Sequence, residues 1–113
     1  MKVINRIKTN EDFALTIKNG RSLRNESFTL IYRKTELNRI RIGISVSKKI
    51  GNAVTRNKVK RQVRAMCDSL FDYNSGSIDV VLIIKNGFLL KNFHENKAIL
   101  QNCISEVNLG VTK

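Results

Sequence analysis

Nine residues between positions 56 and 64 concentrate the side chains of this chain that are best suited to bind a polyanion. The segment is RNKVKRQVR. On a helix, Arg56, Lys60 and Arg64 follow one another at a spacing of four residues and form a ridge that rises about 6 Å per step. That step is close to the spacing of phosphates along a nucleic-acid strand, and each arginine adds a planar fork for two phosphate oxygens. The spacing therefore predicts contacts to several backbone phosphates at once.

Asn57 stands among these cations and adds a different chemistry. Its amide can donate to a phosphate or a sugar, or its carbonyl can accept from a metal-bound water. Other metal chemistry has little support, because His94 is the only histidine and Cys67 and Cys103 are the only cysteines. We expect both cysteines to be free and buried, and His94 to lie at a helix start or on the surface. No catalytic residue is predicted in this chain.

The positive charge is unevenly distributed along the chain. Lys and Arg number 21 against 9 for Asp and Glu, which gives a net charge of +12, yet no acidic residue occurs between Glu36 and Asp68. That interval holds nine positive residues: Arg39, Arg41, Lys48, Lys49, Arg56, Lys58, Lys60, Arg61 and Arg64. Charges this dense repel one another unless a polyanion neutralises them, and nucleic acid is favoured over anionic lipid. The alternative is a basic face that is merely solvated.

Length and composition limit the class of protein. A chain of 113 residues with 42% hydrophobic residues is expected to form one globular domain over residues 1–113. No apolar run approaches the roughly 20 residues of a membrane helix, and the N-terminal residues contain no secretory apolar segment. We therefore expect a soluble, cytoplasmic protein without a membrane partner.

The first half of the chain predicts one helix and a hairpin. Thr9 is placed to cap a helix that ends at Gly20. Residues 27–33 and 39–47 alternate between apolar and polar positions, which indicates two strands, and residues 35–38 fit a hairpin loop between them. In the second strand Gly43, Ser45 and Ser47 share one face, which either forms a shallow groove for an extended chain or is simply exposed to solvent.

The second half predicts a helix, a strand and a helix. One helix starts between Asn52 and Thr55, and its packed face is predicted to contain Val59, Val63, Met66, Cys67 and Leu70. Residues 78–84 are nearly all apolar and predict an interior strand covered on both faces. Asn92 and Glu95 cap the last helix. The fold class is therefore α+β, with a mixed sheet of about four strands, three helices and the order α-β-β-β-α-β-α.

The basic segment resembles a known motif. Its pattern, with Arg56, Asn57, Lys60, Arg61 and Arg64 at the matching positions, is similar to R-N-x-x-K-R-x-x-R in the protein subunit of bacterial ribonuclease P. The similarity extends upstream through residues 41–54 (RIGISVSKKIGNAV), and to residues 6–8 (RIK) and 10–13 (NEDF). The resemblance covers roughly residues 6–64.

This resemblance implies a specific function. The family's ribonucleoprotein removes the 5′ leader of precursor tRNA by Mg²⁺-dependent phosphodiester hydrolysis. The catalytic groups and most of the Mg²⁺ binding belong to its RNA subunit, which the small basic protein assists as an accessory subunit. Partners implied are the ribonuclease P RNA and precursor tRNA, with no small-molecule substrate. The family fold also implies a left-handed β-α-β crossover, against the usual right-handed rule.

The resemblance also assigns roles to residues of this chain. The expected contacts to the catalytic RNA are Lys48, Lys49, Arg56, Asn57, Lys58, Lys60, Arg61 and Arg64. The expected cleft for the leader, between the first helix and the sheet, contains Phe13, Ile17, Tyr32, Ser45 and Ser47, where aromatic rings can stack on bases. Arg6 and Lys8 form a basic N-terminal arm. The alternative for Phe13 and Tyr32 is that they are core residues.

Three positions depart from the family pattern. Ile17 stands where an aromatic residue is common, so apolar contact is expected there instead of stacking. Lys58 stands where arginine is frequent, which keeps the charge and loses the fork. Residues 85–87 (KNG) lack the Arg-Pro pattern that often follows the last strand.

Other functions fit the composition less fully. A structural RNA-binding protein of the ribosomal type, without an enzymatic partner, is the main alternative. A membrane-surface protein is disfavoured because the basic helix lacks a large aromatic wedge. A self-contained protein nuclease is disfavoured because the acidic residues are scattered and do not suggest a two-metal site.

Overall fold

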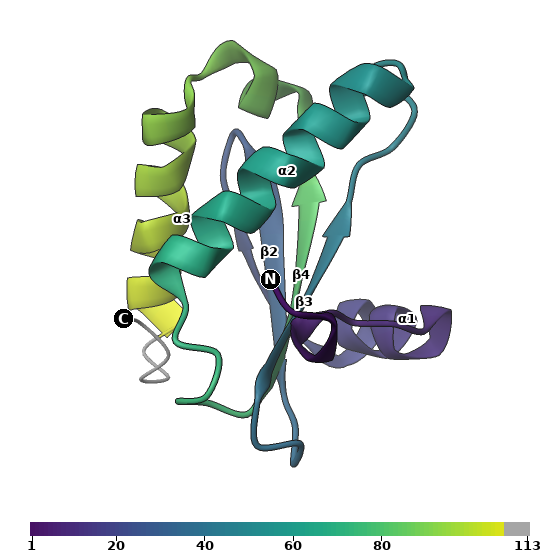
Figure 1. Cartoon of the computed structure of the whole chain (residues 1–113), viewed down its shortest axis with the longest axis vertical. Helices are drawn as coiled ribbons and strands as arrows, with labels where there is room; N and C mark the ends of the chain where they lie inside the picture. The colour runs from purple at the N-terminus through teal and green to yellow at the C-terminus, as the bar shows by residue number, and fades with distance from the viewer. Residues whose placement is uncertain (108–113) are drawn as a thin grey trace.

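A computed structural model describes residues 1–107 and shows a four-stranded sheet with helices on both faces (Figure 1). The elements in chain order are η1 (Val3–Asn5), α1 (Asn10–Asn19), β1 (Arg21–Arg24), β2 (Phe28–Lys34), β3 (Ile40–Ser45), α2 (Ala53–Leu70), β4 (Ile78–Ile84), η2 (Asn86–Leu90) and α3 (Phe93–Val107). The predicted fold class and the order α-β-β-β-α-β-α are confirmed.

Each of the three long helices begins at a side-chain cap, and the caps at Thr9 and Asn92 were predicted from the sequence. The Thr9 hydroxyl accepts from the backbone N–H of Asp12 at 3.1 Å, and the Asn52 side chain accepts from Thr55 at 2.9 Å. Asn92 and Glu95 cap α3 reciprocally, each side chain accepting from the other's backbone N–H. These bonds satisfy N–H groups that have no partner within the helix, and so they determine where each helix starts.

The strand order is β1-β2-β4-β3, so β4 lies between the two strands that were predicted to form a hairpin. That hairpin prediction is wrong: β2 pairs antiparallel with β4, and β3 pairs parallel with β4. The nearly continuous apolar sequence of β4 is stable only in an interior position, covered on both faces and paired along both edges. The hairpin of this sheet is instead β1–β2, where the Asn25 side chain accepts from Ser27 and Phe28.

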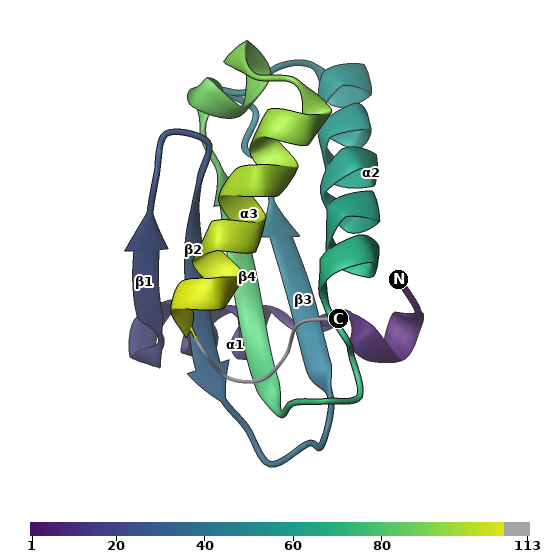
Figure 2. The same cartoon turned by 90° about the vertical axis from the view of Figure 1, so that its left-hand side faces the viewer.

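The connection from β3 through α2 to β4 has the unusual left hand. In Figure 2 both strands run upward, and α3 lies in front of the sheet. α2 packs on that same face, and the chain passes from β3 leftward to β4. Parallel neighbours joined by a helix are almost always right-handed, so this crossover confirms the expectation that came from the family resemblance.

The main core lies between the sheet and the pair α2 and α3. The five residues predicted for the packed face of α2, Val59, Val63, Met66, Cys67 and Leu70, are all buried. They meet Ile40, Ile42, Val80 and Leu82 of the sheet and Leu100 and Ile104 of α3. Both cysteines are free and buried, as predicted, and burial raises the pKa of the Cys67 thiol.

The opposite face of the sheet is covered only in part, because α1 alone crosses it (Figure 2). Within residues 1–107, no helix has both the length and the apolar character needed to span a membrane.

Candidate functional site

The outer face of α2 carries the basic residues that the sequence singled out. Asn57, Lys58 and Arg61 are exposed, whereas Arg56, Lys60 and Arg64 are half-buried because they lie closer to the packed face. Lys48 and Lys49 are exposed in the loop that precedes α2. None of these cations forms a salt bridge with any residue in the described part of the chain. We refer to Arg56, Asn57, Lys58, Lys60, Arg61 and Arg64 as the basic face of α2.

Two arginines of the acid-free interval do not belong to this surface. Arg41 is buried, with 8% of its surface exposed, and its Nε and Nη2 donate to the two carboxylate oxygens of Asp79 at 2.8 and 2.6 Å. Its Nη1 reaches Asp12 on α1 at 3.2 Å. The hydrogen bonds to Asp79 raise the pKa of Arg41, so its charge is permanent and internally neutralised. Arg39 donates to the backbone carbonyl of Ile4.

Asp79 is a structural residue that the sequence interpretation missed. It is completely buried in β4, and Arg33 also approaches it at 3.3 Å. In the sequence it appeared only as an interruption of an apolar strand. A lone carboxylate in a buried strand requires a cationic partner. The position of Asp79 in an apolar strand therefore indicated that one of the basic residues is buried with it.

The N-terminal arm lies along the free edge of β3 and reaches the basic face of α2. Ile7 donates to the carbonyl of Ile42 at 3.0 Å, and the Asn5 side chain donates to the carbonyl of Ile40 at 2.9 Å. Arg6 therefore lies beside α2, while Lys8 remains exposed.

Arg6, Lys60 and Arg64 converge on a hollow of about 140 Å³ that Phe13 also lines. No acidic side chain lines this hollow. The Nε of Arg6 is buried without a hydrogen-bond partner among the described residues. An unsatisfied buried donor is unfavourable by about 1–3 kcal/mol, and an oxyanion in the hollow would supply the missing acceptor. The hollow joins the basic face of α2 to the surface under α1.

The surface beside α1 is built by sheet register. One row of residues across the sheet, Ser22, Ile31, Val81 and Gly43, lies under α1. The next row consists of Arg24, Thr29, Ile83 and Ser45, of which Arg24 is exposed and the other three are half-buried. This second row is a partly exposed strip of the sheet beside α1, where the groove for the leader was predicted.

The rotation of α1 determines which of its side chains face this groove. Asp12 points to Arg41, and the ring of Phe13 lies against Gly43. Phe13 is therefore turned toward Ser45, and Ile17, one helical turn later, is on the same side with 41% of its surface exposed. Phe13, Ile17 and Ser45 thus lie on the same side of the sheet, and their contact with a leader stays a prediction. Ser47 lies beyond the end of β3 and is exposed.

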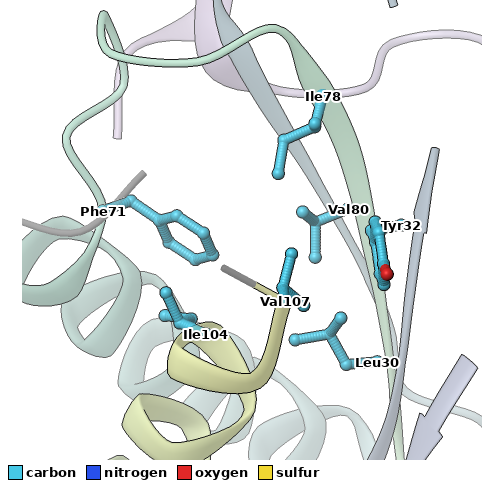
Figure 3. Close-up of a pocket in the computed structure, with 7 residues that line it drawn as sticks. All are labelled: Leu30, Tyr32, Phe71, Ile78, Val80, Ile104 and Val107. Atoms are coloured by element: carbon cyan, nitrogen blue, oxygen red, sulfur yellow. The ribbon is translucent and has the colours of Figure 1, made fainter. Parts of the chain in front are cut away.

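The prediction that Tyr32 belongs to the same cleft is wrong. Tyr32 pairs with Val80 and lies on the face that carries α3, where Figure 3 shows it across a small apolar gap from Phe71. The residue of β2 that faces α1 is Ile31, whose methyl group lies close to Gly20. The alternation of the strand could have predicted this, because Tyr32 shares its face with the core residues Phe28 and Leu30.

Metal-binding groups do not gather in the described part of the chain. No three His, Cys, Asp or Glu side chains of residues 1–107 lie close enough together to hold a metal ion. Asn57 is exposed on α2, and the prediction that it contacts a metal-bound water stays a prediction. His94 is exposed in the first turn of α3.

Comparisons with known proteins agree with this geometry. The family model described as Ribonuclease P matches residues 1–108. The chain is 39% identical to the ribonuclease P protein component of Mesoplasma florum, over 87% of this chain and 90% of that protein. It is 41% identical to the one from Listeria welshimeri, over 88% of this chain and 85% of that protein.

Solved structures show the same fold. The RNase P protein of Staphylococcus aureus superposes with a TM-score of 0.81 at 30% identity, covering 94% of this chain and 97% of that one. The RNase P protein of Thermotoga maritima gives a TM-score of 0.74 at 33% identity, covering 87% and 93%. A fold with a left-handed crossover, a basic helix and a family match over nearly its whole length leads to one conclusion: this chain belongs to the ribonuclease P protein family.

Proposed function

We propose that this chain is the protein subunit of a ribonuclease P ribonucleoprotein and assists Mg²⁺-dependent removal of the 5′ leader from precursor tRNA in the cytoplasm. The observation that carries the proposal is the hollow shared by Arg6, Lys60, Arg64 and Phe13. It places the basic face of α2 next to the groove along α1. In this proposal the catalytic RNA binds the basic face of α2, and the single-stranded leader binds next to it, along α1.

The basic face of α2 binds the catalytic RNA in this proposal. Its cations have no salt-bridge partner among residues 1–107, so phosphates do not compete with internal carboxylates. Arg61 is exposed, and its guanidinium can grip two phosphate oxygens. Lys48 and Lys49 extend the same surface along the preceding loop.

The groove beside α1 holds the leader. A single strand is bound by positive charge together with flat apolar surfaces on which bases stack. Phe13 supplies a ring, Ile17 supplies apolar contact, and Ser45 and Thr29 offer hydroxyl groups along the floor. Arg24 places a cation at the β1 end of the row.

Magnesium is held by the RNA in this proposal. Among residues 1–107, no three His, Cys, Asp or Glu side chains lie close enough together to hold a metal ion. The chain's own contribution is to bind and orient the two RNAs, and no catalytic step is assigned to its side chains.

A reconstituted cleavage assay tests the proposal. Purified protein is added to ribonuclease P RNA and precursor tRNA at low Mg²⁺, and 5′ cleavage is measured. We expect a clear gain in cleavage with the unmodified protein and its loss with the double variant R61Q/R64Q, whose unfolding free energy should be nearly unchanged. Lys97→Gln on α3 is the control for loss of charge elsewhere.

Two results would contradict the proposal. Tight RNA binding with no gain in 5′ cleavage favours the structural RNA-binding alternative. A log–log salt dependence of RNA affinity near zero, instead of a slope of about −3.5 for five phosphates on single-stranded RNA, removes the electrostatic account of α2.

A further inference from the structure

A second basic hollow lies at the sheet edge away from α2. It has a volume of about 400 Å³ and is lined by Asn19, Arg21, Tyr32, Arg33, Lys34 and Val107. In the strand order β1-β2-β4-β3 it belongs to the β1–β2 edge, whereas the N-terminal arm and α2 lie at the β3 side. It is therefore separate from the basic face of α2.

The lining of this hollow selects an anion. Arg21 and Lys34 are exposed and form no salt bridge with any residue of the described range. No carboxylate is among the described residues that line it. The larger hollow on the other side of Arg33 differs in this respect, because Asp12 and Glu36 line it.

Tyr32 gives the hollow an aromatic component. Sheet pairing sets Arg21 directly opposite Tyr32, and Lys34 follows two residues later on the same face. Tyr32 is half-buried: it lines both the apolar gap of Figure 3 and this open hollow. Its hydroxyl has no hydrogen-bond partner among the described residues, in contrast to that of Tyr73, which donates to Asp68.

We infer that this hollow binds one nucleotide of single-stranded RNA, with the base against Tyr32 and the phosphate between Arg21 and Lys34. Aromatic side chains combined with cations are the usual means by which proteins hold single strands. The volume lies in the range of small-molecule binding sites. The inference rests on the proposed function for the identity of the RNA, and it adds a contact outside both the basic face of α2 and the groove.

The groove beside α1 indicates how a strand would reach this hollow. The row ends on β1 at Arg24, three residues or about 10 Å along the strand from Arg21, and the alternation of the strand puts Arg21 on the opposite face, with Tyr32. A leader that crosses the α1 face would therefore have to turn around the β1 edge to reach Arg21. Catalytic RNA is the other source of a single-stranded nucleotide at this edge.

Two binding measurements, one on the assembled ribonucleoprotein and one on the free protein, distinguish these sources. The affinity of the holoenzyme for precursor tRNA is measured with a series of leaders from two nucleotides upward, and the affinity of the free protein for the catalytic RNA is measured in parallel. The variants are R21Q, K34Q and Y32L, with K97Q as the control of equal charge loss. Y32L retains apolar volume for the core while removing the aromatic ring and the hydroxyl.

We expect R21Q, K34Q and Y32L each to lower the affinity of the holoenzyme for precursor tRNA with long leaders at least fivefold, and to leave the affinity for short leaders unchanged. The control K97Q should bind both like the unmodified protein. If the loss appears instead in binding to the catalytic RNA alone, the site holds and its RNA is the catalytic subunit. If K34Q and K97Q act equally, or if Y32L changes only the unfolding free energy, the inference is wrong.

Failure of this inference is separable from failure of the proposed function. R61Q/R64Q is tested in parallel with R21Q, K34Q and Y32L. If R61Q/R64Q abolishes cleavage while those three variants bind precursor tRNA as the unmodified protein does, only the second site is overturned. An absence of RNA binding by the unmodified protein overturns both.

Discussion

The ring of Phe13 lies so close to Gly43 that a Cβ atom on residue 43 would come within 2.6 Å of its Cε2. Phe13 belongs to α1 and Gly43 to the middle of β3. The absence of a side chain at residue 43 therefore allows α1 to approach the sheet and places the aromatic ring beside the groove.

Substituting Gly43 with alanine should displace Phe13. We expect G43A to lower the unfolding free energy by about 1–3 kcal/mol, because overpacking forces the ring or the helix to move. Leader-dependent affinity of the holoenzyme should fall, while affinity of the protein for the catalytic RNA should stay the same.

A double-mutant cycle with Phe13→Ala isolates this contact. In the F13A background the clash is absent, so G43A should have little effect on urea unfolding. An equal effect of G43A in both backgrounds would show that the ring does not lie over Gly43.

Ile17 offers a gain-of-function variant. Its side chain is 41% exposed beside the groove, so a larger ring fits there without entering the core. Ile17→Phe should strengthen leader binding about tenfold, since stacking of one base on an aromatic ring is worth about 1–3 kcal/mol. The affinity of the holoenzyme for precursor tRNA measures this, with Ile17→Leu as the control for apolar size. Unchanged affinity in I17F would mean that position 17 does not face the strand.

The sequence allowed the three long helices and the basic face of α2 to be predicted because local chemistry determines them, whereas β1 was not located. The caps at Thr9, Asn52 and Asn92 and the apolar stripe of α2 each depend on residues within a few positions of one another. Lys60 and Arg64 are on the outer side of α2 for the same reason.

Strand pairing could not be predicted in the same way, because it depends on contacts distant in sequence. β2 and β3 are close along the chain and suggested a hairpin, yet each pairs with β4. The most apolar strand, β4, is most stable in the interior of the sheet, and its pairing depends on all the strands together and not on neighbours in sequence.

The residues expected to line the leader cleft fall on two faces of the sheet. Phe13, Ile17 and Ser45 lie on the α1 side, but Tyr32 was assigned to the wrong face, although its alternation with Phe28 and Leu30 placed it on the core side. Neighbouring residues of a strand point to opposite faces of the sheet, so assigning the role to Tyr32 instead of Ile31 places it on the wrong face. Arg41 was counted with the free charges because its partner Asp79 is 38 residues away.

Asp79 should be the most sensitive polar residue of the fold. It is completely buried and accepts two hydrogen bonds from Arg41, so Asp79→Asn leaves a buried guanidinium without its counter-charge. We expect D79N to lower the unfolding free energy by about 3–5 kcal/mol. Asp12→Asn is the matched control: it breaks the outer, partly exposed bond to Arg41, for which under about 1 kcal/mol is expected. Urea unfolding measures both, and equal effects would contradict the assignment of Asp79 as the principal partner.

Stability should fall at alkaline pH. Burial raises the pKa of the Cys67 and Cys103 thiols, and burial together with the hydrogen bond to Asp68 raises that of the Tyr73 phenol. In the unfolded chain these groups release protons from about pH 8.5 to 10, while the folded state retains them. The unfolded state then binds fewer protons, so the unfolding free energy declines as the pH rises through that range. The contribution is fully present below the unfolded pKa values and is lost above them.

Cys67 dominates this alkaline effect, because its side chain is completely buried, and it contributes a slope of at most about 1.4 kcal/mol per pH unit. Urea unfolding between pH 7 and 10 measures the slope. Cys67→Ala is the informative variant: a cavity lowers its stability at every pH, but its decline above pH 8.5 should be shallower than that of the unmodified protein. Parallel curves for the two proteins would show that Cys67 titrates alike in the folded and unfolded states, and that the thiol is more accessible to water than its position on the packed face of α2 implies.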